Sequence, residues 1–272
     1  MKVAALQMVS GIDLQGNLAQ ARGLLEQAAQ AGAELAALPE YFCLLGRRDS
    51  DKLALRETMG DGPIQRFLAG AARELGLWIV GGTLPLVTDS ADRVYNSTLV
   101  FSPQGECVAR YDKIHLFAFD NGRERFDEAR TIAAGREPAR FAMTARDGTL
   151  WRVGLSVCYD LRFPELYRAH ARAGADLLLV PSAFTHDTGQ AHWEVLLRAR
   201  AVENLAYVLA PAQGGLHENG RRTWGHSMLV DPWGQVLAQQ AQEGPGVVLG
   251  ELHAGRLRET RGQLPALEHR IL

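Results

Sequence analysis

Residues 152–165 read Arg-Val-Gly-Leu-Ser-Val-Cys-Tyr-Asp-Leu-Arg-Phe-Pro-Glu, a segment that combines a strand, a sharp corner and the start of a helix. Apolar residues alternate with small ones up to Cys158, which predicts a β-strand. Pro164 suits the first turn of a helix, and helical spacing continues from there to Gly174. Cys158 is therefore expected at a strand-to-helix corner, where the free N–H groups of a helix lower a thiol pKa and can hold an oxyanion.

The alternative for Cys158 is a buried core cysteine, because free cysteines are among the most buried residues in proteins. The other two cysteines, Cys43 and Cys107, are far from it in the sequence, and the three match no zinc-ligand spacing. An odd number of widely separated cysteines predicts free thiols in a reducing compartment, so we expect a cytoplasmic protein.

Length and composition are those of an ordinary globular protein. The 272 residues can bury a large core, and 47% of them are hydrophobic and 22% charged. The formal net charge of −2 gives no electrostatic reason to expect nucleic acid or an acidic membrane as a partner. No apolar run reaches membrane-spanning length, and a strand pattern begins at Lys2, so neither an anchor nor a signal peptide is expected.

Strand and helix patterns interleave along the chain, which favours a single α/β domain over residues 1–272, with a C-terminal tail from about residue 255. The first predicted elements are a strand at 2–8, a helix at 17–33, a strand at 35–38, a helix at 61–76, a strand at 77–84 and a hairpin at 95–113. The segment 118–136 is long and charged, which is typical of a functional or mobile loop. The predicted inward residues of a helix at 190–205 are Val195, Leu196, Ala199 and Val202.

Three of the predicted strands end in a polar residue that is able to take part in catalysis. Glu40 follows the strand at 35–38, Lys113 ends the second strand of the hairpin, and Cys158 ends the strand of the corner segment. Taken singly, Glu40 could cap a helix or face a loop, and Lys113 could lie at a sheet edge. Ligands bind at the carboxyl ends of strands in layered sheets, so we expect the three to converge there. A carboxylate can then take the thiol proton, and an ammonium group can stabilise an oxyanion.

Three segments resemble the signatures of the nitrilase, or carbon–nitrogen hydrolase, superfamily in their residues, order and spacing. They are Leu38–Tyr41, Tyr111–Phe117 and Val157–Leu166. The resemblance extends essentially over the whole chain, and it implies an α/β fold of the four-layer αββα sandwich type. It also implies a triad in which Glu40 is the general base, Lys113 the oxyanion-stabilising cation and Cys158 the nucleophile. A second family glutamate, which positions the attacking water or the leaving amine, matches Glu128.

Further segments resemble the amidase branch of this superfamily that acts on α-keto acid amides derived from glutamine-like groups. They lie at 181–184, 191–204 and 225–234. The implied activity is hydrolysis of the amide bond of deaminated glutathione through a cysteine thioester, with no metal and no cofactor. The alternatives are an ω-amidase acting on α-ketoglutaramate or α-ketosuccinamate, and another aliphatic or N-carbamoyl amidase. Family members commonly pair through the helix after the nucleophile and the C-terminal segment, so a homodimer or a higher even oligomer is expected.

Arg162 is the candidate for recognition of a carboxylate on the small-molecule amide substrate. It lies in the corner segment, close to Cys158 in the sequence. A guanidinium group binds a carboxylate through two parallel hydrogen bonds, and the near-zero net charge leaves anion recognition to local cations. Tyr159 in the same corner is expected to line the substrate pocket, as are Phe184 and Thr185 after the next strand. A surface arginine that caps the turn is the alternative.

Two other classes of function remain open from the sequence. A metal hydrolase could use some of the eight histidines, but none of them forms a ligand pair of the HExxH kind. The histidines considered for this role are His186, His192, His217 and His226. An inactive binding module or a thiol sensor on the same fold would keep Cys158 but would not need Glu40 or Lys113. Ammonia release from candidate amides distinguishes an enzyme from such a module.

Overall fold

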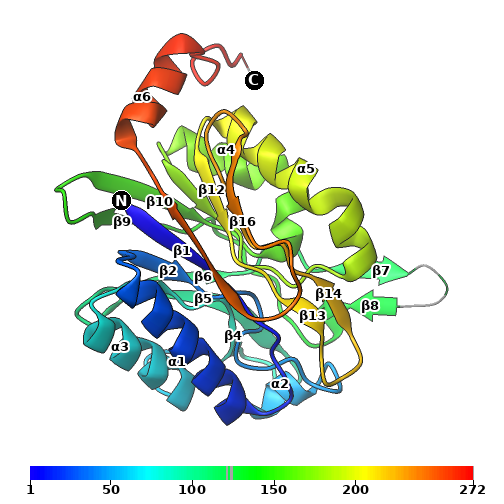
Figure 1. The fold of residues 1–272 in the computed structure, drawn as a ribbon. Helices are drawn as coiled ribbons and strands as arrows, with labels where there is room; N and C mark the ends of the chain where they lie inside the picture. The colour runs from blue at the N-terminus through cyan, green and yellow to red at the C-terminus, as the bar shows by residue number, and fades with distance from the viewer. Residues whose placement is uncertain (121, 123–124, 272) are drawn as a thin grey trace.

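Two β-sheets pack face to face in the computed structural model, with helices on their outer sides (Figure 1). The structure describes residues 1–120, 122 and 125–271. Within these ranges no helix has the length and the apolar character needed to cross a bilayer.

The first sheet contains the N-terminal strand and the strand that carries Lys113 at its end. Its strand order is β17 (Gly246–Glu251), β1 (Lys2–Gln7), β2 (Leu35–Ala37), β3 (Trp78–Val80), β5 (Val94–Phe101) and β4 (Leu84–Val87), and β6 (Cys107–Asp112) also pairs with β5. β1, β2 and β3 run parallel, whereas the other pairs in this sheet are antiparallel. The parallel strands are buried along most of their length, as their continuous apolar sequences indicate.

The second sheet contains the strand that leads to Cys158. Its strand order is β16 (Val236–Gln239), β15 (Met228–Val230), β12 (Tyr207–Ala210), β11 (Leu177–Leu179), β10 (Leu150–Leu155) and β9 (Arg140–Thr144). β10, β11 and β12 run parallel, so their carboxyl ends lie at one edge of the sheet. That edge carries the corner segment and the residues that follow β11.

Helices cover the outer face of each sheet (Figure 1). The first sheet is covered by α1 (Leu14–Gln30) and α3 (Pro63–Leu75), and the second by α4 (Pro164–Arg172) and α5 (His186–Asn204). Successive side chains of β1 point to opposite faces of the sheet, and this alternation shows how the layers meet. Ala4 and Leu6 pack with α1 and α3. Val3 and Ala5 belong to the core between the two sheets. The layers are therefore helix, sheet, sheet and helix, which confirms the predicted α/β four-layer αββα sandwich.

The sequence provides a cap at the start of α1 and residues suited to both ends of α3. The side chain of Asp13 accepts a hydrogen bond of 2.7 Å from the N–H of Gly16 at the start of α1. Pro63 occupies the first turn of α3, and Gly76 ends it with a φ of 63°, a left-handed conformation that glycine adopts without strain.

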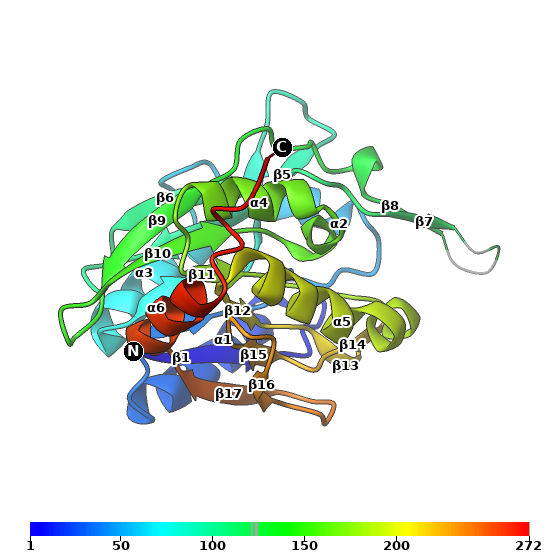
Figure 2. The same ribbon diagram turned by 90° about the horizontal axis from the view of Figure 1, so that it is seen from above.

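The remaining elements are short and lie around the edges of the sheets. They are α2 (Asp51–Ala54), β7 (Ala118–Asp120), β8 (Arg125–Asp127), the 3₁₀-helices η1 (Glu128–Arg130) and η2 (Cys158–Arg162), β13 (Gly214–Leu216), β14 (Arg222–Trp224) and α6 (Ala254–Gln263). β7 and β8 pair as a hairpin that projects from the rest of the molecule (Figure 2). This hairpin and η1 occupy part of the segment predicted as a long loop at 118–136; residues 121, 123 and 124 of that segment lie outside the described residues.

The predicted inward face of α5 is wrong except at Leu196, which is half-buried and packs against the core. Val195 is 61% exposed and Val202 is 45% exposed, whereas the buried face is formed by Trp193, Leu197 and Ala201. The helix carries two apolar stripes, and the spacing of apolar residues does not show which of the two packs on the sheet. In the structure the aromatic ring of Trp193 and the small Ala201 fit the sheet, which leaves the valine stripe on the surface.

The strand predicted at 77–84 is broken into two strands. β3 ends at Val80, and Gly82 turns the chain with a φ of 49°. A Cβ atom at Gly82 would lie 2.1 Å from the carbonyl oxygen of Pro39, so only glycine allows this close approach. The turn therefore packs directly against the segment that carries Glu40.

Candidate active site

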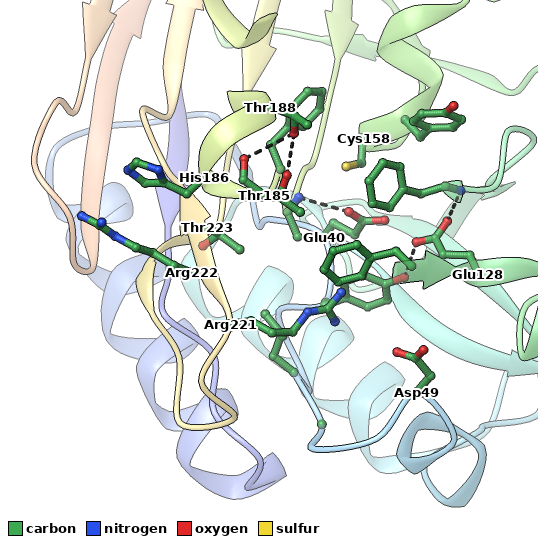
Figure 3. A pocket seen from close by; sticks show the side chains of 18 of the residues that line it. Glu40, Asp49, Glu128, Cys158, Thr185, His186, Thr188, Arg221, Arg222 and Thr223 are labelled. Atoms are coloured by element: carbon green, nitrogen blue, oxygen red, sulfur yellow. Dashed lines mark hydrogen bonds between the residues drawn. The ribbon is translucent and has the colours of Figure 1, made fainter. Parts of the chain in front are cut away.

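A cavity of about 480 Å³ opens at the ends of the strands that carry the predicted catalytic residues (Figure 3). Glu40 after β2, Glu128 in η1 and Cys158 after β10 all line it. The four residues expected to bind substrate, Arg162, Tyr159, Phe184 and Thr185, line the same cavity. The fold thus brings together residues that are far apart in the sequence.

Glu40 is held by three hydrogen bonds. Its side chain is 1% exposed, and Oε1 accepts bonds from Lys113 Nζ at 2.9 Å and from Asn96 Nδ2 at 3.0 Å. Oε2 accepts a bond of 3.1 Å from the backbone N–H of Ala183, which follows β11. Burial raises the pKa of Glu40 above its usual value, and the ammonium group of Lys113 only partly offsets this effect. A carboxylate with a raised pKa is suited to accept a proton and return it.

Lys113 lies between two carboxylates and is completely buried. Its Nζ donates to Glu40 Oε1 at 2.9 Å and to Glu128 Oε1 and Oε2 at 2.9 and 2.8 Å. Burial alone would lower the pKa of Lys113, but the charges of Glu128 and Glu40 raise it well above the usual lysine value. The side chain is therefore a fixed ammonium group, and its pairing offsets the cost of burying the charge.

Glu128 is the second carboxylate on Lys113. Besides the lysine, it accepts hydrogen bonds from the hydroxyl of Tyr41 and from the N–H of Phe117, both at 2.7 Å. Burial acts to raise the pKa of Glu128, but Lys113 and these hydrogen bonds lower it below its usual value. Glu40 and Glu128 therefore have pKa values shifted in opposite directions, although they share one ammonium group.

Cys158 begins the 3₁₀ turn η2, and its side chain points into the cavity (Figure 3). Its φ is 48°, an uncommon conformation for a residue with a side chain, and its N–H donates to Pro181 O at 2.9 Å. Burial and the charge of Glu40 raise the pKa of the Cys158 thiol well above its usual value, and Lys113 only partly offsets this. The predicted lowering of this pKa by a helix N-terminus is wrong, because η2 separates Cys158 from the start of α4 at Pro164. The resting thiol is protonated and needs a base.

Asp160 connects the corner to the end of β6. Its buried carboxylate accepts hydrogen bonds from Tyr111 Oη at 2.7 Å, Val157 N at 2.8 Å and His115 N at 3.0 Å, and it lies 2.7 Å from His115 Nδ1. Tyr111 and His115 flank Lys113 in the chain. Asp160 therefore fixes the nucleophile turn relative to the lysine.

The side chain of Arg162 extends across two aromatic rings at the cavity wall. Its guanidinium carbon lies 5.7 Å from the ring centre of Tyr159 and 5.3 Å from that of Phe184. Nη1 is 3.2 Å from His192 Nδ1. Thr185 is held by a hydroxyl contact of 2.7 Å to Thr188. These contacts leave the guanidinium group on the Cys158 side of the cavity, where a carboxylate on the acyl part of a substrate could reach it.

Several residues of the site were not predicted from the sequence. Asn96 binds Glu40, but it is one of three consecutive polar residues in β5, and nothing in the sequence distinguishes it from Ser97 and Thr98. Tyr41 and Asp160 stand in the same segments as Glu40 and Cys158, but nothing in those segments shows what they bind. Lys52 and Arg221 also line the cavity and carry no local signal.

The histidines considered as metal ligands are engaged in other contacts. His217 is buried, with Nδ1 2.9 Å from Ser10 O and Nε2 2.7 Å from Thr223 Oγ1. His186 and His226 pack on the ring of Trp224. Within the described ranges, no group of three or more His, Cys, Asp or Glu side chains is arranged to hold a metal ion.

Comparison with known proteins gives matches over almost the whole chain. The sequence profile of carbon–nitrogen hydrolases matches residues 2–262. The deaminated glutathione amidase of Synechocystis is 42% identical over 271 residues, which cover 98% of this chain and 97% of that protein. The deaminated glutathione amidase of Homo sapiens is 41% identical, over 98% of this chain and 81% of its own length. The crystal structure of Saccharomyces cerevisiae Nit3, a member of branch 10 of the nitrilase superfamily, is 29% identical, with a TM-score of 0.87 over 100% of this chain and 97% of that chain.

Proposed function

Because the chain belongs to the carbon–nitrogen hydrolase family, we propose that it hydrolyses the amide bond of deaminated glutathione through a thioester on Cys158. The chain is a hydrolase that acts on amide C–N bonds, as its family and its relatives indicate. The observation that carries the proposed mechanism is the buried ammonium of Lys113, which is bonded to Glu40 and Glu128, two residues that line the cavity together with Cys158.

In the first half of the reaction, the ionised carboxylate of Glu40 takes the proton of the Cys158 thiol while the sulfur bonds to the amide carbon. The carbonyl oxygen becomes an oxyanion, and Lys113 Nζ is suited to stabilise it. The N–H of Tyr159 is a second donor, since the first hydrogen bond of η2 runs from Asp160 N to Val157 O. Glu40 then gives its proton to the nitrogen, the C–N bond breaks, the amine leaves and the acyl group remains on sulfur.

In the second half, a water molecule attacks the thioester. Glu40 takes a proton from the water as the oxygen bonds to the acyl carbon, and the same donors stabilise the second oxyanion. The C–S bond then breaks, the acid leaves, and Glu40 returns the proton to the sulfur of Cys158. Glu128 keeps Lys113 in place through both halves and is suited to orient the water or the leaving amine.

Substrate choice rests on the relatives and on Arg162. Deaminated glutathione carries a carboxylate next to a ketone in its acyl half, and the guanidinium group of Arg162 is available on the Cys158 side of the cavity. Tyr159, Phe184 and Thr185 complete this wall. The ω-amidase substrate α-ketoglutaramate shares the same acyl half, so it is the closest alternative.

A panel of amides tests this function. The purified protein is given deaminated glutathione, α-ketoglutaramate and a simple aliphatic amide, and the release of the acid product is followed. We expect the highest kcat/KM for deaminated glutathione. A higher kcat/KM for α-ketoglutaramate would make the protein an ω-amidase, and activity on the aliphatic amide alone would contradict recognition of an α-keto acid.

We also propose that the protein is a cytoplasmic homodimer or higher even oligomer. All three cysteines are free, which suits a reducing compartment. The pairing expected above uses α4, the helix after the nucleophile, and the C-terminal segment; α5 packs beside α4 and exposes Val195 and Val202. Exposed apolar side chains of this kind are typical of protein–protein interfaces.

A further inference from the structure

Three cations line the cavity without a carboxylate within ion-pair distance among the described residues. They are Lys52, Arg162 and Arg221. By contrast, the neighbouring Arg222 also lines the cavity but forms an ion pair of 2.6 Å with Glu243. A partly buried cation without a partner is stabilised by an anionic ligand, so each of the three is a candidate to bind one.

Arg221 is held on the side of the cavity that carries Glu128. It lies in the turn between β13 and β14, and its N–H donates to Asn219 Oδ1 at 2.9 Å. Its guanidinium carbon is 4.6 Å from the ring centre of Phe126. Phe126 belongs to β8 of the projecting hairpin, and Glu128 follows in η1. In the view of Figure 3, Glu40 lies between Arg221 and Cys158.

Lys52 lies on the same side as Arg221. Its Nζ is 5.4 Å from the ring centre of Tyr41, the residue that donates to Glu128, and 3.4 Å from Thr131 Oγ1. Burial lowers the pKa of Lys52, and the charges of Glu128 and Asp49 only partly offset this, so a further carboxylate would stabilise its charged form. Asp49 also lines this side, but its side chain is exposed and forms no ion pair with either cation.

We propose that Arg221, with Lys52, binds a carboxylate on the amine half of the substrate. The proposal rests on the function proposed above, in which the acyl half stays on Cys158 near Arg162 and the amine leaves beside Glu40. The amine half of deaminated glutathione is a dipeptide that ends in a free carboxylate, whereas the amine released from α-ketoglutaramate is ammonia. Recognition of this second carboxylate therefore makes the enzyme prefer amides of peptide-like amines over primary amides.

The test compares two substrates that share the acyl half. One is deaminated glutathione, and the other is its derivative in which the C-terminal carboxylate is replaced by a neutral carboxamide. We expect Arg221→Met to lower kcat/KM for the free carboxylate by about 10- to 100-fold, mainly through KM, because it removes a charge-assisted hydrogen bond. For the carboxamide the change should stay below about twofold. Arg221→Lys keeps the charge but not the planar fork, so it should recover part of the loss.

Two matched variants separate this role from a general effect on the site. Arg222→Met removes a neighbouring cation that already has a partner, so it should leave the ratio of the two kcat/KM values unchanged. Arg162→Met should lower kcat/KM equally for both substrates, because it acts on the half that they share.

Each result of the comparison decides the proposal. Equal losses for both substrates in Arg221→Met, or no loss for either, would overturn the role of Arg221 while wild-type turnover leaves the amidase function standing. If the wild type hydrolyses neither substrate, the proposed function fails, and the role of Arg221 fails with it. Thermal melting of each variant shows that the comparison is made between folded proteins.

Discussion

The reactivity of Cys158 depends on charges that burial brings close to it. Burial and the carboxylate of Glu40 keep the thiol protonated, so the cysteine is inert until its proton is removed. The same carboxylate, with its raised pKa, interacts with the thiol and can accept that proton. Lys113 holds Glu40 in a fixed geometry and offers a positive charge to the oxyanion that follows.

The pH profile tests the role of Glu40. The pKa of Glu40 is raised above the usual 4.5, so as the pH falls its carboxylate becomes protonated at a higher pH than that of an ordinary glutamate. Because only the ionised carboxylate can act as the base, kcat/KM falls over the same pH range. We therefore expect an acid limb above pH 4.5 in the wild type. Glu40→Gln should lower kcat by about 10²–10⁴-fold, and its residual activity should lack this limb. An unchanged kcat in Glu40→Gln would show that Glu40 is only structural.

At the scale of the elements, the end of β6 and the corner after β10 act as one unit because Asp160 joins them. Tyr111 and His115 bind this carboxylate from either side of Lys113, and Val157 N binds it from the corner. A shift of one element would therefore change the distance between the ammonium group and the sulfur.

Replacement of Asp160 tests this connection. Asp160→Asn exchanges an acceptor oxygen for a donor, so at least one of its hydrogen bonds is lost; bonds to a charged group contribute about 1.5–3 kcal/mol each. We expect a lower melting temperature and a lower kcat, because Asp160 sets the position of Cys158 relative to Lys113. Tyr111→Phe removes a single bond and should show a smaller effect in the same direction. A change in KM alone would contradict a positioning role.

Sequence patterns predict the elements better than they predict how side chains meet. The alternation before Cys158 and the caps of α3 depend on neighbouring residues, so both can be predicted from the sequence. The buried face of α5 could not, because either of its two apolar stripes could pack on a sheet. The partners of Glu40 come from β5 and from the segment after β11, and only the folded chain brings them together.

At the scale of the whole molecule, the site belongs to both halves of the sandwich. Glu40 and Lys113 extend from the first sheet, and Cys158 extends from the second, so the catalytic geometry depends on how the two sheets pack. Val3, Val153 and Leu155 belong to the core that joins the sheets. The sandwich core therefore supports catalysis as well as stability.

The exposed stripe of α5 gives a prediction for the assembly. We expect the wild type to sediment as a dimer or a higher even oligomer, and Val195→Glu, which places a charge on this stripe, to dissociate it. Val108→Glu is the matched control, since Val108 is 43% exposed on β6, in the other sheet. A wild type that sediments as a monomer at all concentrations would contradict the proposed assembly.

The measurement that tests the mechanism most directly is intact-protein mass spectrometry of an acid-quenched reaction with deaminated glutathione. We predict that the wild type carries one α-ketoglutaryl group and that peptide mapping places this group on Cys158 and not on Cys43 or Cys107. We also predict that Cys158→Ala shows neither the adduct nor turnover while it remains folded. Substantial turnover by Cys158→Ala, or an adduct on another cysteine, would contradict the account.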